Sequence, residues 1–110
     1  MSILTTILNA TIFLPLIFGS NEVKVGSRVE ISTNAPVGAY VQAFDLTTGE
    51  WLGADTSDED AWVEFTAVVG NGVIIWEEEG TKECYNLPVD AVNPVNGKAE
   101  LRFQDRTTCP

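Results

Sequence analysis

The chain has 110 residues, which fits a single domain that can bury a core without metals or many disulfides. Hydrophobic residues make up 45% of it and charged residues 20%, a balance typical of globular rather than disordered proteins. Six Lys and Arg against sixteen Asp and Glu give a net charge of −10, which excludes nucleic acid and disfavours anionic lipid as partners. The sequence has no His, the commonest general base and metal ligand.

The first 20 residues carry no charge and are strongly apolar. Four interpretations compete: a secretory signal, a membrane span, a pair of core strands, and an arm that docks on a neighbouring subunit. A signal peptide needs a basic n-region and a clear cleavage site, and neither is evident. A membrane span needs about 20 apolar residues, whereas several polar residues and Pro15 interrupt this run. The membrane is therefore the less favoured alternative.

We predict an apolar N-terminal arm over residues 1–20 and a β-sandwich domain over residues 21–110. The second half of the arm has apolar side chains at strand spacing, and these are its predicted interface residues. They are Ile12, Leu14, Leu16 and Phe18. Strand addition at a sheet edge of the neighbouring subunit would supply main-chain hydrogen bonds and pockets for alternate side chains.

The stretch from residue 37 to residue 65 carries a series of motifs. In order, these are VGA at 37–39, VQAFD at 41–45, TGE at 48–50, TSDED at 56–60 and WVEF at 62–65. The series resembles the carboxypeptidase-regulatory-like, or transthyretin-like, β-sandwich domains. In that family a Gly usually follows the acidic turn, whereas this chain has Ala61, for which a left-handed backbone is less comfortable. The resemblance implies a structural or adhesive module rather than an enzyme.

Alternation of apolar and polar residues predicts the remaining strands. Val29 and Ile31 should face a core, and so should Val63 and Phe65. Asn71-Gly72 is a hairpin signal. The segment 73–76 is apolar on both faces, so it should be a central strand or be covered, and the arm is the candidate cover.

The last predicted strand spans residues 98–104, with Leu101 and Phe103 directed inward. The predicted fold is all-β: an immunoglobulin-like or transthyretin-like antiparallel β-sandwich of seven or eight strands.

The two cysteines fit neither a zinc set nor a C-x-x-C redox pair. We predict a disulfide between Cys84 and Cys109, because Cys109 lies one residue from the end of the sequence, where an unanchored tail would fray. The alternative is two separate buried thiols.

Acidic residues crowd in two turns, at 55–60 and 77–79. Calcium needs six to eight oxygen ligands, but the D-x-D-x-D-G loop is missing, and a solvated turn explains the same residues. A nucleophilic Ser or Cys would lack a His partner. We therefore expect no metal, no cofactor and no enzymatic activity.

Two tryptophans are candidate contact residues. If Val63 and Phe65 face the core, Trp62 faces outward; an exposed Trp on a sheet either packs under a loop or anchors an interface. Trp76 ends the doubly apolar segment. Together with the arm, Trp62 and Trp76 form the predicted interface.

These features predict a non-enzymatic structural subunit of a larger assembly, such as a viral capsid decoration (cement) protein or a filament subunit. The expected partner is a second copy or a larger protein lattice, at a virion or extracellular surface. The alternative is a secreted or membrane-tethered adhesion module that binds a glycan or a protein.

Overall fold

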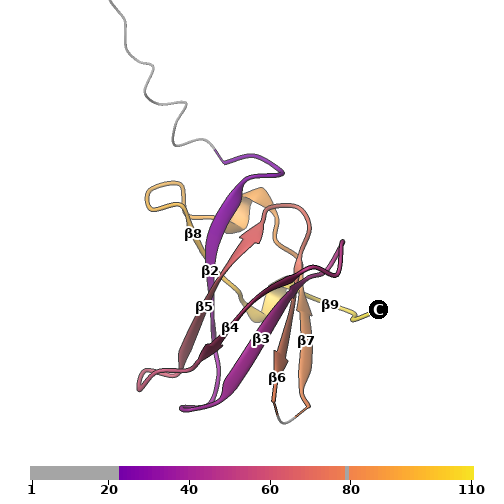
Figure 1. The fold of residues 1–110 in the computed structure, drawn as a ribbon. Helices are drawn as coiled ribbons and strands as arrows, with labels where there is room; N and C mark the ends of the chain where they lie inside the picture. Colours follow the sequence, from indigo (N-terminus) through magenta and orange to yellow (C-terminus); the bar gives the residue numbers. More distant parts are fainter. Residues whose placement is uncertain (1–22, 79) are drawn as a thin grey trace, which may run out of the picture.

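The computed structural model of the chain describes residues 23–78 and 80–110, so the predicted arm and its four interface residues lie outside the described residues. The described part is a β-sandwich of a three-stranded and a five-stranded sheet (Figure 1). Its strands are β2 (Arg28–Asn34), β3 (Tyr40–Asp45), β4 (Trp51–Thr56), β5 (Trp62–Val68), β6 (Val73–Glu77), β7 (Lys82–Tyr85), β8 (Lys98–Glu100) and β9 (Arg106–Thr107). The predicted all-β sandwich is confirmed.

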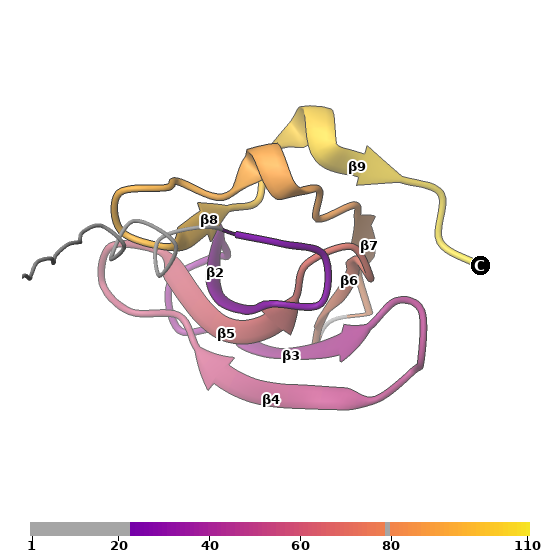
Figure 2. The same ribbon diagram turned by 90° about the horizontal axis from the view of Figure 1, so that it is seen from above.

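The strand order is β5-β2-β8 in one sheet and β4-β3-β6-β7-β9 in the other. Seen from the end of the sandwich, the larger sheet curves around the smaller one (Figure 2). All strand pairs are antiparallel except β2–β8, which is parallel. This pair departs from the antiparallel prediction because the chain crosses between sheets after β7 and enters β8 in the direction of β2. The crossing includes a short 3-10 turn, η2 (Val89–Ala91).

The core lies between the two sheets and is built mainly from alternate residues of β2, β3, β5 and β6. On β3 and β5 the inward side chains of Val41, Ala43 and Val63 are fully buried. The predicted inward pairs on β2 and β5 are confirmed: Val29, Ile31, Val63 and Phe65 are all buried. Residues 73–76 form a central strand, as predicted, because β6 pairs with β3 on one side and β7 on the other.

The predicted strand over residues 98–104 is only partly right. β8 ends at Glu100, and Leu101 is buried as expected. Phe103, however, is 79% exposed and begins a second 3-10 turn, η3 (Phe103–Asp105). The chain bends here to bring β9 alongside β7, so the alternation that would have turned Phe103 inward stops.

Asn71-Gly72 is also not a hairpin turn, although the chain does turn there. This turn joins β5 in the smaller sheet to β6 in the larger one, so the two strands do not pair. Gly72 has a φ of 78°, and a Cβ on it would lie 2.8 Å from the carbonyl oxygen of Tyr85. The glycine therefore allows a close approach of two backbones at the crossing between sheets.

Asp45, at the end of β3, ties this crossing to the β3–β4 hairpin. One carboxylate oxygen accepts hydrogen bonds from the backbone N–H groups of Thr47 and Thr48 at 2.9 and 2.8 Å, and the other accepts one from the Asn71 side chain at 3.0 Å. Burial alone would raise the pKa of Asp45, but these hydrogen bonds outweigh it and lower the pKa. Asp45 thus stabilises the fold as an anion.

The acidic turn before β5 places Ala61 in the left-handed region, with a φ of 65°. Among the described residues, Ala61 is the one non-glycine with positive φ. The turn is fixed by Asp58, whose carbonyl oxygen accepts the N–H of Ala61 and whose carboxylate accepts the N–H groups of Asp60 and Trp62. Ala61 adopts this conformation although it has a Cβ, so the turn retains backbone strain in the fold.

The register of the sandwich predicts opposite effects for two phenylalanines. Phe65→Ala should lower the free energy of unfolding by about 3–5 kcal/mol, because this side chain is 6% exposed and packs in the core. Phe103→Ala, the matched control, should cost less than about 1 kcal/mol. Denaturant unfolding measures both, and similar losses for the two variants would contradict the register.

Ala61→Gly should raise the free energy of unfolding by about 0.5–1 kcal/mol. A left-handed residue with a Cβ costs about 1–2 kcal/mol, and this relief exceeds the extra entropy of glycine in the unfolded chain. Ala54→Gly on β4 is the control and should destabilise by about 0.5–1 kcal/mol. Equal destabilisation by both variants in thermal or denaturant unfolding would rule out strain at Ala61.

Candidate functional site

The two sheets present chemically different outer faces. Residues directly opposite each other on paired strands share a face, so the register determines which side chains lie together. The outer face of the three-stranded sheet is mostly polar and charged, and Lys98 and Glu30 form an ion pair on it at 3.2 Å. Its side chains are Arg28, Glu30, Ser32, Asn34, Trp62, Glu64, Thr66, Val68, Lys98 and Glu100.

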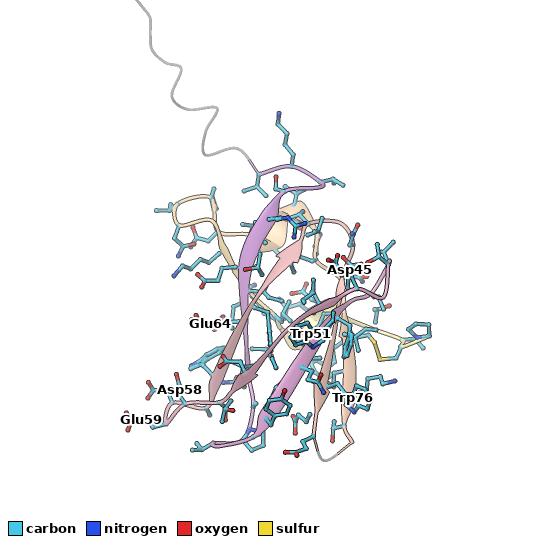
Figure 3. The ribbon with its side chains drawn as sticks, viewed as in Figure 1. Asp45, Trp51, Asp58, Glu59, Glu64 and Trp76 are labelled. Atoms are coloured by element: carbon cyan, nitrogen blue, oxygen red, sulfur yellow. A yellow bond between two sulfur atoms is a disulfide. The ribbon has the colours of Figure 1, made fainter. Side chains whose placement is uncertain are left out.

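The outer face of the five-stranded sheet is mostly aromatic and apolar. Over β3, β4, β6 and β7 its side chains are Tyr40, Gln42, Phe44, Trp51, Ala54, Thr56, Ile74, Trp76, Lys82 and Cys84. We call this set the aromatic face. Lys82 is its one charged member, in a chain of net charge −10. Figure 3 shows Trp51 over β3 and β4 and Trp76 over β6 and β7, whereas Glu64 belongs to the other sheet.

Strand register brings these aromatic residues together from distant parts of the sequence. Phe44 on β3 lies opposite Trp51 on β4 and opposite Ile74 on β6. A register shift at residues 43 and 44 places Leu52 against the core and leaves Trp51 on the outer face. Such a β-bulge changes the direction of a side chain without ending the strand.

The rings of the aromatic face are partly fixed by contacts with one another. The centroids of Phe44 and Trp76 lie 6.1 Å apart, and the Lys82 ammonium lies 5.3 Å from the centroid of Trp76. The indole N–H of Trp51 donates to the side-chain oxygen of Gln42 at 3.2 Å. These contacts hold the side chains in place before any partner binds, which lowers the entropy lost on binding.

Much of this aromatic surface is accessible to solvent. Trp51 is 57% exposed, Tyr40 42% and Trp76 40%. Because the Trp51 N–H has its partner within the face, the exposed part of the Trp51 ring is apolar. Trp and Tyr with this combination of fixed position and exposure are typical anchors of binding surfaces.

The predicted disulfide is confirmed and borders the aromatic face. Cys84 lies opposite Ile74 and is bonded to Cys109, with the two Cα atoms 5.3 Å apart. The bond fastens the segment after β9 to β7. On the inner side of β7, burial and a hydrogen bond to Glu83 raise the pKa of Tyr85. Arg106 also forms an ion pair with Glu83, which fixes β9 at this end of the sheet.

The acidic turns stabilise backbone structure in the described residues. Asp58 closes its own turn, and Asp55 accepts the N–H of Glu64 at 2.9 Å. Within residues 23–78 and 80–110, no three acidic or cysteine side chains are grouped so that they could hold a metal ion. In the same ranges, no helix is long and apolar enough to cross a membrane.

The structure separates the two tryptophans of the predicted interface. Trp76 lies on the aromatic face, whereas Trp62 begins β5 in the other sheet and is half-buried. Sequence analysis did not select Tyr40, Phe44 or Trp51. The signal was present: Tyr40, Gln42 and Phe44 alternate with the buried Val41 and Ala43.

Comparison with protein-family models, curated proteins and solved structures found no match to this chain.

The aromatic face should be dispensable for folding. Trp51→Thr and Trp76→Thr keep a side chain suited to a strand, and each should cost at most about 1 kcal/mol of unfolding free energy. Chemical denaturation of the two variants checks this. A loss of about 3 kcal/mol or more would show that these rings are part of the structural core and not a surface kept for binding.

Proposed function

We propose that the chain is a non-enzymatic structural subunit of a larger assembly, in which the N-terminal arm of one subunit docks on its neighbour. The observation that carries the proposal is the aromatic face, with its exposed Tyr40, Trp51 and Trp76. Buried interface centres are enriched in aromatic residues and depleted of charge, and this face has the same composition.

The distribution of charge supports a role of the aromatic face in binding and argues against its exposure by chance. A chain with net charge −10 has ample charge to cover its surface, yet it leaves one sheet face with a single lysine. The three-stranded sheet shows that an outer face of this fold can be mostly polar and charged. An exposed aromatic patch of this kind marks an interaction site.

The N-terminal arm is the second feature that supports the proposal. An uncharged apolar segment of 20 residues joined to an acidic domain needs an apolar surface to cover it. A viral capsid decoration protein or a filament subunit, with an immunoglobulin-like or transthyretin-like domain and an arm, would have both features. The Cys84–Cys109 disulfide supports a virion or extracellular location, because such bonds persist in oxidising surroundings.

A second candidate is a secreted or membrane-tethered adhesion module. The favouring observation is that indole and phenol rings on a sheet face also provide stacking surfaces for sugars, and Gln42 and Thr56 add polar groups beside them. In this case the chain would be a monomer once residues 1–20 are deleted, and the aromatic face would bind a glycan or another protein.

The proposal predicts that charge in the arm abolishes assembly. The full chain should form oligomers in sedimentation velocity experiments, and Leu14→Asp with Leu16→Asp should yield monomers, because a buried carboxylate in an apolar contact is costly. Thr11→Asp is the control for added charge at a polar position of the same segment, and this variant should still assemble.

The sandwich of the double variant should unfold cooperatively with its disulfide intact. Normal assembly of the Leu14 and Leu16 variant would refute docking by the arm. Loss of its folded sandwich would instead make residues 14 and 16 part of a core strand.

A further inference from the structure

We infer that the aromatic face is the acceptor for the arm, and that it binds residues 3–18 of a second copy of the chain. This inference rests on the proposed function and assigns the surface on which docking takes place. Three observations carry it: the condition of the sheet edges, the charge of the two surfaces, and the place where the described chain begins.

The edges of the five-stranded sheet are poor acceptors compared with its face. β4 forms one edge, but Asp55 on it is bound to the N–H of Glu64 on β5, so part of this edge is held against the other sheet. β9 forms the opposite edge and has two residues, next to the segment fastened by the disulfide. A long apolar segment finds more contact area on the face, where β3, β4, β6 and β7 lie side by side.

The chemistry of the two surfaces matches. Residues 3–18 have no charged side chain, and the aromatic face has only Lys82, already placed against Trp76. No like charges would meet, and Lys82 would keep its contact with the Trp76 ring. A partner segment with acidic residues would instead be repelled by the chain's net charge of −10.

A second copy is favoured over the same chain because of where the arm is attached. The described chain begins at Val23, which packs against the core, and continues through Gly26, whose N–H donates to the carbonyl of Val69 just after β5. This attachment is on the three-stranded sheet, at the end of the sandwich where β2 begins (Figure 1). To reach its own aromatic face, the arm would have to pass around the sandwich and reverse direction.

The length of the arm is sufficient to span a neighbour's face. Sixteen extended residues reach about 50 Å, roughly three times the length of the five- and six-residue strands β3, β4 and β6. Two or three alternate apolar side chains of the arm could then contact Trp51, Phe44 and Trp76 at once. Each subunit would have one donor and one acceptor, which allows rings or filaments of many copies.

The inference is tested by mixing two defective full-length chains. The arm variant carries Leu14→Asp and Leu16→Asp and keeps its aromatic face. The face variant carries Trp51→Glu and Trp76→Glu and keeps its arm. Each should be monomeric alone, with at least a tenfold weaker self-association than the unmodified chain. Their mixture should form one-to-one heterodimers, because the arm of one fits the face of the other.

Matched controls separate a folding defect from a binding defect. Trp51→Thr with Trp76→Thr repeats the face variant without buried charge and should also weaken assembly. Trp62→Thr alters the remaining tryptophan, on the other sheet, and should leave assembly unchanged. Cooperative unfolding and an intact disulfide confirm the fold of each variant.

The outcomes distinguish the two proposals. If the arm variant is monomeric but both face variants assemble normally, the arm docks elsewhere; the inference is wrong and the proposed function stands. If both defective chains are monomeric and their mixture forms no heterodimer, the aromatic face contacts something other than the arm, which also overturns the inference. If the unmodified chain is monomeric at all concentrations, the proposed function itself fails.

Discussion

The structure depends on the contact between the inner faces of its two sheets. Val41 and Ala43 on β3, Val63 on β5 and Val73 on β6 are fully buried there, and β2, β3, β5 and β6 bury alternate residues in the core. Because the side chains of a strand alternate, burial of one set leaves the other set on an outer face. The core therefore fixes which residues are available for contact with other molecules, even though it contains none of them.

The two outer faces differ in the kinds of side chain that they expose. The three-stranded sheet presents charges and an ion pair to water. The five-stranded sheet presents Trp51 opposite Phe44, and the ring of Phe44 lies beside that of Trp76. Both faces belong to the same small domain and have the same requirement for solubility. Their difference supports the proposal that the aromatic face is a binding surface and that the uncharged arm is its complement.

Much of the fold could be predicted from local sequence, because alternation and turn residues act over a few positions. The assignment of strands to one sheet or the other could not be predicted in this way. Asn71-Gly72 has the composition of a hairpin turn, yet the chain passes there from one sheet to the other. Phe103 continued an alternating pattern, but its position depends on the pairing of β9 with β7. The aromatic face was found only in part because its members come from four strands, and Trp51 is brought to it by the register shift in β3 and β4.

The central claim is that the aromatic face is the contact surface in the assembled protein. The three tryptophans give three indole N–H signals in a nitrogen–proton correlation spectrum of the full chain, which can be followed through a dilution series. The account predicts that the signals of Trp51 and Trp76 change chemical shift as the chain assembles, whereas the signal of Trp62 keeps its chemical shift. A change confined to Trp62, or assembly without any change at Trp51 and Trp76, would contradict it.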